Sequence, residues 1–375
     1  MKNDISILVQ AYGESNQWDL FLKSIPEPPF EQSSAWAYAR QIEGWNSCQI
    51  LLRQNAQVVA GVQVLTWQLS KLGTIGIVPQ GPCFSEEGWH YRERLVAFVK
   101  QWVKKERLLY LVWDINYRFP ELPELLQGEN FHKKIKSIPP QPVIEASLVL
   151  DLTPDMDTLF SQFRRDRRKN IRRGLKQSFL YRVGQRSDLE TFFSLMISMC
   201  RRRQTKPTNS NIQFFYRLWD ALTPGNGISL HLLDYNDKTV CAMLCFNIGD
   251  TFRAFKWGWT GEYAGLNITH VLYWKTIEWA KEKGFKKYDF VQVDPDVAEV
   301  FLSGGLMSEE LKNRSFYGPT IHKMCYTGDF VTYPGVYMYV PKSAFRIMIA
   351  FSTRFKFVQQ LLNWVIKKVY GRKRR

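Results

Sequence analysis

A run of basic residues, FRRDRRKNIRRGLKQSF at 163–179, is the part of this sequence best suited to binding chemistry. It holds eight Lys or Arg side chains and one acid. On a helix, residues three or four positions apart share a face, so Arg164, Arg168 and Arg172 form one line of cations. Such like charges repel by roughly a few tenths of a kcal/mol per pair, which a bound anion would offset. We expect these arginines to bind substrate phosphate groups. The alternative is a solvated helix face that bridges two domains.

Apolar residues within the run predict how its helix is anchored. Phe163, Ile171 and Leu175 fall roughly on one side and can dock on a core. We expect the run to continue a helix that begins after Pro154, because proline is favoured in a first helical turn. Arg203, at the end of a later predicted helix, would extend the same cationic surface and bind substrate with it.

Two further charged residues are candidates for a reactive or binding site. Asp114 ends the apolar run 107–115, where it could orient or deprotonate an incoming substrate group; the alternative is a strand-end aspartate that caps a turn. Arg40, on the first predicted helix, could clamp a substrate phosphate with two parallel hydrogen bonds. No Ser/His/Asp or Cys/His arrangement can be argued from the sequence, so we propose no covalent intermediate.

Composition narrows the class of protein. The 375 residues are 45% hydrophobic and carry a net charge of +16, with a pI near 9.5. A chain of this length suits two domains, and its charge favours polyanionic partners over a merely basic surface. The six cysteines form no CxxC pair and the five histidines are scattered, so we expect no metal and a reducing cytoplasm. The N-terminus has no apolar signal-like segment, and no run of 18 uncharged apolar residues exists.

Apolar periodicity predicts strands that alternate with helices, which is typical of an α/β domain. In the first part of the chain the predicted elements are strands 47–54 and 58–68, strand 73–84, helix 86–106 and strand 107–115. The proline-rich segment 137–143 suits a linker. The second part is predicted to contain helices 188–203, 212–222 and 267–283 and strands 228–234, 239–248, 251–258 and 286–293.

The C-terminal tail, 341–375, has a composition of its own. It contains ten Lys or Arg residues and no acid, and its apolar residues fit one helical stripe. Such a basic amphipathic helix is typical of segments that lie on an anionic membrane. We expect residues 343–375 to bind a membrane surface; the alternative is a C-terminal helix packed on the core.

Five fragments, in order, resemble motifs of the Fem-type (FemABX) peptidyltransferases. They are QSSAWAYARQ (32–41), PQGPCF (79–84), the stretch 148–177, LNITHVLYWKTIEWAKEKGFKKYDF (266–290) and LKNRSFYGP (311–319). The resemblance implies an α/β (α+β) fold of two acetyltransferase-like (GNAT-like) domains with mixed sheets. It implies domains at 1–145 and 146–317, with 318–340 returning to the first and 341–375 as the tail.

The resemblance also assigns roles to particular residues. Lys312 stands in the closing motif, F-K-x-x-F-G in the family, where the family places a functional lysine; it would stabilise an oxyanion or anchor a donor phosphate, and the alternative is a surface lysine. Arg40 stands where the family usually has Lys. The closing motif is one residue longer than usual, with Leu311 in place of Phe.

From these features we expect a cytoplasmic, membrane-peripheral aminoacyltransferase without a cofactor. It would move an amino acid from aminoacyl-tRNA to an amine of a lipid-linked peptidoglycan precursor. The segment 259–270 lacks the paired glycines that hold the pyrophosphate of acyl-CoA, and Glu262 would repel phosphate. An acyl-CoA-dependent N-acyltransferase that acts on an amino sugar of a surface polysaccharide is the first alternative. A non-catalytic RNA- or membrane-binding protein is the second.

Overall fold

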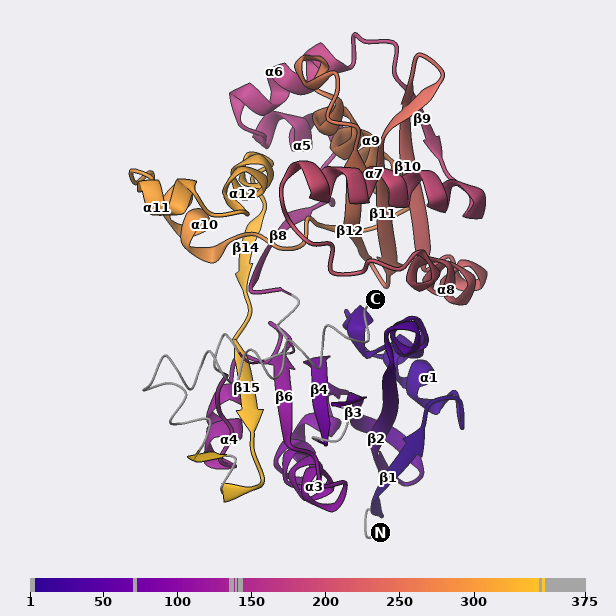
Figure 1. The fold of residues 1–375 in the computed structure, drawn as a ribbon, viewed down its shortest axis with the longest axis vertical. Helices are drawn as coiled ribbons and strands as arrows, with labels where there is room; N and C mark the ends of the chain where they lie inside the picture. The colour runs from indigo at the N-terminus through magenta and orange to yellow at the C-terminus, as the bar shows by residue number, and fades with distance from the viewer. Residues whose placement is uncertain are drawn as a thin grey trace. The chain divides into compact units, whose positions relative to one another are not determined.

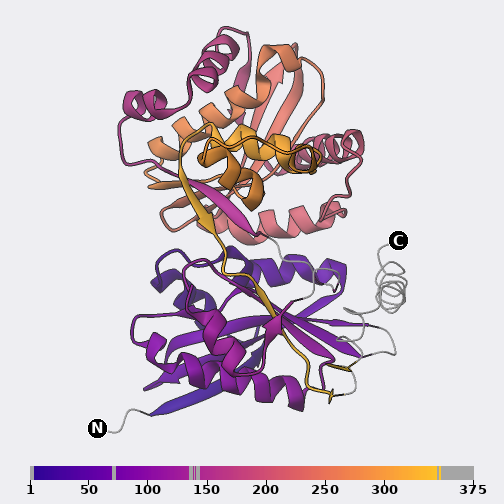
Figure 2. The same cartoon turned by 90° about the vertical axis from the view of Figure 1, so that its left-hand side faces the viewer.

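The chain folds into two compact units (Figures 1 and 2). The first unit comprises Met1–Val143 and Tyr333–Arg375, and the second comprises Ile144–Thr332. The structure is a computed structural model that describes residues 4–69, 73–134, 138, 140, 144–343, 346 and 347.

The first unit is built on one mixed sheet of eight strands. The strand order is β1 (Ile5–Ala11), β2 (Trp45–Gln54), β3 (Gln57–Gln68), β4 (Thr74–Gly81), β6 (Tyr110–Ile115), β15 (Val336–Tyr339) and β7 (His132–Lys133), and β5 (Cys83–Phe84) pairs with β3. Strands β4 and β6 run parallel, and the chain between them includes α3 (Arg92–Lys105). The remaining α-helices described in this unit are α1 (Gln17–Ser24), α2 (Ser34–Arg40) and α4 (Leu122–Gly128).

Helices cover both faces of this sheet because successive side chains of a strand point to opposite faces. On β2, Leu51 packs in a cluster with Trp18 and other residues of α1. Its neighbours Ile50 and Leu52 pack in a separate cluster with α3. The strand β2 is therefore buried on both sides in this part, which explains why Ile50, Leu51 and Leu52 are three consecutive apolar residues.

The second unit has a seven-stranded mixed sheet. Its order is β14 (Asp329–Thr332), β8 (Ala146–Asp151), β13 (Lys287–Asp289), β12 (Thr251–Trp259), β11 (Lys238–Ile248), β10 (Ile228–Tyr235) and β9 (Leu180–Val183). Strands β12 and β13 are parallel and are joined by α9 (Ile268–Glu282). The other α-helices are α5 (Met156–Gln162), α6 (Arg165–Gly174), α7 (Leu189–Arg202), α8 (Ile212–Leu222), α10 (Pro295–Leu302), α11 (Glu309–Lys312) and α12 (Tyr317–Met324).

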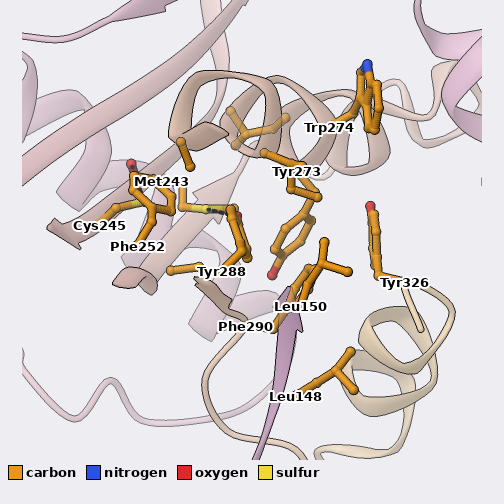
Figure 3. Packing of buried hydrophobic residues seen from close by; sticks show 14 of the residues in the cluster. Leu148, Leu150, Met243, Cys245, Phe252, Tyr273, Trp274, Tyr288, Phe290 and Tyr326 are labelled. Carbon is orange, nitrogen blue, oxygen red and sulfur yellow. Dashed lines mark hydrogen bonds between the residues drawn. The ribbon is translucent and has the colours of Figure 1, made fainter. Parts of the chain in front are cut away.

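The core of the second unit is unusually aromatic. Tyr273 from α9, Tyr288 and Phe290 at the end of β13, and Tyr326 after α12 converge there with almost no exposed surface (Figure 3). The Tyr288 hydroxyl lies 2.8 Å from the hydroxyl of Thr276 and therefore keeps a polar partner inside the core. These rings fix α9 and α12 against the parallel strands.

The chain returns to the first unit later than predicted. Strand β14 pairs with β8, Asp329 opposite Val149, so residues 318–332 belong to the second unit. Strand β15 is the first element after it, and it pairs with β6, Val336 opposite Asp114. In the sequence, the return to the first unit was predicted from the family resemblance alone, because strands of four residues, such as β14 and β15, are too short to show a clear apolar periodicity.

The mixed α/β fold was predicted correctly, but the helix through the basic run was not. Instead of one continuous helix, α5 ends at Gln162 and α6 begins at Arg165. Phe163 is extended, with ψ 148°, and 1% exposed, and the Arg164 amide donates to Cys325 O at 3.1 Å. Burial of Phe163 therefore breaks the helix. Leu175, expected to dock, is 42% exposed.

Two predictions concern residues outside this description. The predicted linker 137–143 is described at 138 and 140 alone, and the predicted membrane-binding segment 343–375 at 343, 346 and 347 alone. Among the described residues, no helix combines the length and the hydropathy that a membrane span requires.

Candidate functional site

The sheet of the second unit opens between its two parallel strands. Strand β12 pairs with β13 at three positions, from Thr251 opposite Lys287 to Arg253 opposite Asp289. Beyond Arg253, β12 continues to Trp259 in pairing with β11. A ligand of an open α/β sheet binds at the carboxyl ends of parallel strands, so this opening is a candidate site.

Irregular backbone on both strands creates the opening. The register of β11 and β12 shifts between Leu244 and Cys245, which leaves Phe255 as an extra residue on β12. After β13, the amides of Phe290 and Val293 pair with β8, while Val291 and Gln292 loop out with φ of 54° and 40°. A β-branched residue at positive φ is strained, and such strain concentrates at functional sites.

Lys323 of α12 lies in this opening. It is 7% exposed, and its ammonium donates to the carbonyls of Val291 and, at 3.0 Å, Gln292. Burial lowers the pKa of Lys323 to about 7, and the positive charges of Lys256 and Arg203 lower it further, against an opposing effect of Asp289. An amine with such a pKa exists in both protonation states at neutral pH, which suits acid–base work.

Asp289 is a structural member of the same strand end. Its carboxylate accepts hydrogen bonds from Ser147 Oγ, from Arg253 Nε at 2.9 Å and from the Val291 amide at 2.8 Å. Asp289 is 4% exposed. These bonds hold the strained turn beside Lys323 in place.

In the first unit, Asp114 occupies the equivalent position on its own parallel pair. It is 1% exposed near the end of β6, and Gln80 Nε2 donates to its Oδ2 at 2.8 Å. Burial lowers the pKa of Lys134 to about 8, while the nearby charge of Asp114 opposes that shift. Asp114 is therefore held by polar neighbours within the fold, and its predicted catalytic role stays a prediction.

Two of the motifs that carry the family resemblance meet in this unit. Gln32 Nε2 donates to Pro79 O at 2.7 Å, and its Oε1 accepts from the Gln63 amide. Gln32 thereby fixes the turn that presents Gln80 to Asp114. Gln32 and the Pro-x-Gly-Pro turn are joined by a hydrogen bond, which explains why the two motifs occur together.

Arg40 is engaged within its own unit. Its guanidinium pairs with Glu43 and lies over the rings of Trp36, at 5.9 Å, and Trp45, at 5.2 Å. A cation held by a carboxylate and two indoles is less able to bind a substrate phosphate than the sequence suggested.

The predicted phosphate-binding arginines of the second unit each have a contact of their own. Arg164 lies over the Phe301 ring at 3.9 Å, Arg168 donates to Ser161 O at 3.1 Å, and Arg172 lies over Phe160 at 5.1 Å. Arg203 donates to Ser315 O at 3.1 Å. Among the described residues, no carboxylate pairs with these four arginines, so their charge stays available to an anion.

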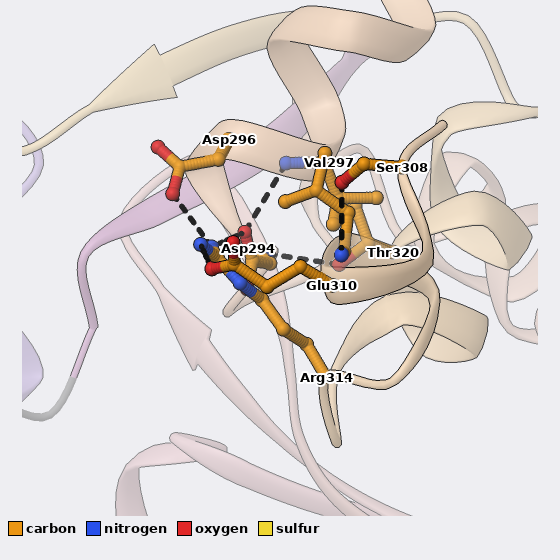
Figure 4. Close-up of polar contacts among 8 residues, drawn as sticks. Asp294, Asp296, Val297, Ser308, Glu310, Arg314 and Thr320 are labelled. Atoms are coloured by element: carbon orange, nitrogen blue, oxygen red, sulfur yellow. Dashed lines mark hydrogen bonds and ion pairs between the residues drawn. The ribbon is translucent and has the colours of Figure 1, made fainter. Parts of the chain in front are cut away.

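Lys312 ends the short helix α11. Its side chain is 45% exposed and its ammonium donates to Glu309 Oε1 at 2.7 Å, and this bond raises its pKa. Counted back from Gly318 without an insertion, the lysine of the family motif falls instead on Arg314. Its guanidinium lies 3.1 Å from Asp294 and 2.6 Å from Asp296, with Glu310 at 3.6 Å (Figure 4).

The sequence interpretation missed two residues, Lys323 and Arg167. Lys323 follows a helical turn of mixed composition, and no pattern marks it as buried. Arg167 is 5% exposed although it lies in the basic run. Its spacing was a usable signal, because Arg167 and Ile171 are four positions apart on α6 and therefore share the docked face.

Comparisons with known proteins identify the type of fold. Residues 161–296 match the model of an acetyltransferase (GNAT) domain, which includes β12, α9 and β13. The crystal structure of FemX superimposes with a TM-score of 0.72 at 17% identity, covering 88% of this chain and 97% of that chain. A tandem GNAT protein from the clavulanic acid biosynthesis pathway gives a TM-score of 0.51 at 11% identity, covering 90% of this chain and 98% of its own. The fold is therefore acetyltransferase-like.

Sequence comparison reaches a more specific set of relatives. The lipid II:glycine glycyltransferase of Staphylococcus epidermidis is 26% identical over 235 residues, which are 60% of this chain and 56% of that protein. Its counterpart in Staphylococcus saprophyticus is 25% identical over 230 residues, 59% of this chain and 55% of that protein. The chain spans about half the length of the curated relatives it matches. These matches confirm the resemblance to the Fem-type transferases.

Among the described residues, no three His, Cys, Asp or Glu side chains gather as metal ligands would. The chemistry available at the opening is that of an amine, a carboxylate and several cations.

Proposed function

We propose that this protein is an acyltransferase that moves an aminoacyl group onto an amine of a lipid-linked cell-wall precursor. The observation that carries the proposal is the opening between β12 and β13, with Lys323 inside it at a pKa of about 7. The relatives named lipid II:glycine glycyltransferase support this choice of acceptor.

The chain's residues supply the proton transfer for this reaction. The acceptor amine attacks the ester carbonyl of the donor, a C–N bond forms, and the C–O bond to the donor's sugar breaks. The neutral amine of Lys323 takes the proton that the attacking nitrogen loses and returns it to the leaving oxygen. Lys256 and Arg203, which lower the pKa of Lys323, favour the neutral form needed for the first step.

The donor proposed is aminoacyl-tRNA. The arginines of the basic run support it, because no described carboxylate neutralises Arg164, Arg168 or Arg172. Contacts of this kind to phosphates weaken steeply with salt. The match to an acetyltransferase domain favours acyl-CoA as the competing donor.

A transfer assay with labelled donors tests the proposal. The protein is incubated with lipid II and either charged tRNA or acyl-CoA, and labelled lipid product is counted. Product that requires charged tRNA and disappears after RNase treatment supports the proposed function. Product with acyl-CoA alone shows the competing donor to be correct. No product with either, together with retained RNA binding, shows a binding protein instead.

On the role that the family resemblance assigns to Lys312, which requires its ammonium to leave Glu309, we predict that Lys312→Ala lowers turnover by about a hundredfold, the order expected for loss of one oxyanion donor. Steady-state rates in the same transfer assay measure this effect. Lys286→Ala, a change at an exposed lysine of the same unit, is the control and should leave the rate unchanged. A wild-type rate in the Lys312 variant removes that residue from the mechanism.

The tail provides an independent prediction about the membrane. Deletion of residues 343–375 is expected to release the protein from vesicles that contain anionic lipid, because the deletion removes nine of the ten Lys and Arg residues of the tail. Co-sedimentation with phosphatidylglycerol vesicles measures this. Undiminished sedimentation of the shortened chain would assign membrane binding to another part of the molecule.

A further inference from the structure

A buried guanidinium in the second unit has no acid beside it. Arg167 of α6 is 5% exposed, and its Nη2 donates to His322 O at 2.7 Å. Its guanidinium also lies over the Tyr326 ring at 4.8 Å. Within the part of the chain that the structure describes, no carboxylate pairs with it. An uncompensated buried charge is strongly unfavourable, so this arrangement calls for a partner that the protein itself does not supply.

The hydrogen bonds around Arg167 fix the protons of two histidines. Its Nη1 lies 3.2 Å from His322 Nδ1. Arginine can only donate, so Nδ1 accepts and neutral His322 carries its proton on Nε2. The Asn170 amide nitrogen lies 3.4 Å from His270 Nε2 and likewise donates, which leaves the proton of His270 on Nδ1. Both tautomers follow from the network of contacts.

Both imidazoles are neutral at physiological pH. Burial lowers the pKa of His270 to about 3, and the charge of Arg167 lowers it further. Burial lowers the pKa of His322 as well, with additional effects of Arg167, His270 and Lys323 in the same direction. The cluster therefore carries one positive charge, that of the guanidinium.

The result is a group of N–H donors that outnumber the acceptors beside them: the Tyr326 hydroxyl lies next to the Arg167 guanidinium and is itself buried. The two imidazole rings are 4.8 Å apart. Among the described residues, Arg167 Nε, His270 Nδ1 and His322 Nε2 have no hydrogen-bond partner and no contact with solvent. Each of these atoms bears a hydrogen, so the cluster offers three donors and one positive charge in one place. Native proteins rarely leave such groups unmatched.

We propose that Arg167, His270 and His322 form a binding site for an oxyanion, a phosphate or carboxylate group. An oxyanion accepts hydrogen bonds only, and its bonds to a guanidinium are short and charge-assisted. Both histidine residues keep some exposed surface, but their donor nitrogens have none, so a ligand reaches these nitrogens only when the side chains around them move. A metal ion does not fit, because the guanidinium would repel it.

The site lies on α6, α9 and α12, and its His322 precedes Lys323 directly in sequence, although the carbonyls that hold Lys323 belong to Val291 and Gln292. It goes beyond the proposed transfer reaction and does not depend on it. A phosphate group or a carboxylate would satisfy the same donors, and titration with phosphate, pyrophosphate and acetate distinguishes the two.

Thermal unfolding of the full chain tests the site without any acyl donor or acceptor. Sodium phosphate, pyrophosphate or acetate is titrated against sodium chloride at equal ionic strength. Because a ligand that binds the native state stabilises it, one of these oxyanions should raise the unfolding midpoint saturably. A response to phosphate or pyrophosphate identifies a phosphate group, and a response to acetate identifies a carboxylate.

Variants locate the response. Arg167→Met and His270→Phe should each abolish the rise, whereas Lys169→Ala, a change at an exposed cation on the same helix, should keep it. Should Arg167→Met fail to fold, His270→Phe alone decides. A midpoint that follows chloride equally, or a rise that survives His270→Phe, overturns the proposal and leaves Arg167 as a structural residue solvated by water.

Discussion

Replacement of Lys323 by methionine is expected to lower the rate of acyl transfer by a factor of about one hundred or more, the range typical of a lost general base. Methionine keeps the length and apolar body of the side chain but has no proton acceptor of useful basicity. The measurement is single-turnover transfer to lipid II with saturating donor. The matched control is Lys286→Met, at an exposed position of the same unit.

The pH dependence of the reaction tests whether Lys323 acts as a general base. Burial lowers the pKa of Lys323 to about 7, so the neutral, basic form grows as pH rises through that value. The wild-type rate should rise about tenfold from pH 6 to a plateau above pH 8, in addition to any slope from the acceptor amine. The methionine variant should show the acceptor's slope alone, without the inflection near pH 7.

A second substitution at the same position separates the basicity of Lys323 from its structural role as a hydrogen-bond donor. Lys323→Arg keeps a cation that can donate to the carbonyls of Val291 and Gln292, but arginine does not lose its proton in this pH range. We expect a folded protein with the activity of the methionine variant. Near wild-type activity in Lys323→Arg would show that the cation, rather than the amine, serves the reaction.

Strong local periodicity made much of the fold predictable. The helix predicted over 212–222 is α8 without a shift, and the strand pair 47–54 and 58–68 is β2 and β3. Each has a regular apolar pattern long enough to specify its type. The break between α5 and α6 could not be predicted, because it depends on where the rest of the unit receives Phe163.

The candidate site was less predictable than the fold, for a physical reason. The basicity of Lys323 and the donor excess around Arg167 come from burial by segments distant in sequence. Arg167 and His322, for example, are 155 positions apart. The composition of the basic run showed its charge. It did not show that seven of its eight Lys and Arg residues are exposed or partly exposed, whereas Arg167 is buried. That difference is decided by tertiary packing.

Gly258→Ala is expected to be the most destabilising single methyl addition near the opening. A Cβ on this residue of β12 would lie 2.3 Å from Met196 N and 2.5 Å from Leu195 C, both backbone atoms of α7. Backbone of a helix cannot rotate away as a side chain can, so α7 must shift off the sheet. Overpacking of this kind costs about 3 kcal/mol or more of the free energy of unfolding.

Urea unfolding followed by circular dichroism measures the Gly258 effect. Gly265→Ala, at a position in the same unit where an added Cβ meets nothing within 4 Å, should shift the midpoint little. The comparison also bears on the reaction, because Gly258 lies on the part of β12 beyond its pairing with β13. If α7 must seat closely there to place Arg203 near Lys323, the folded fraction of Gly258→Ala should also show a raised pKa in its pH–rate profile. A variant that is as stable as the wild type would mean that α7 does not rest on β12 as closely as the structure shows.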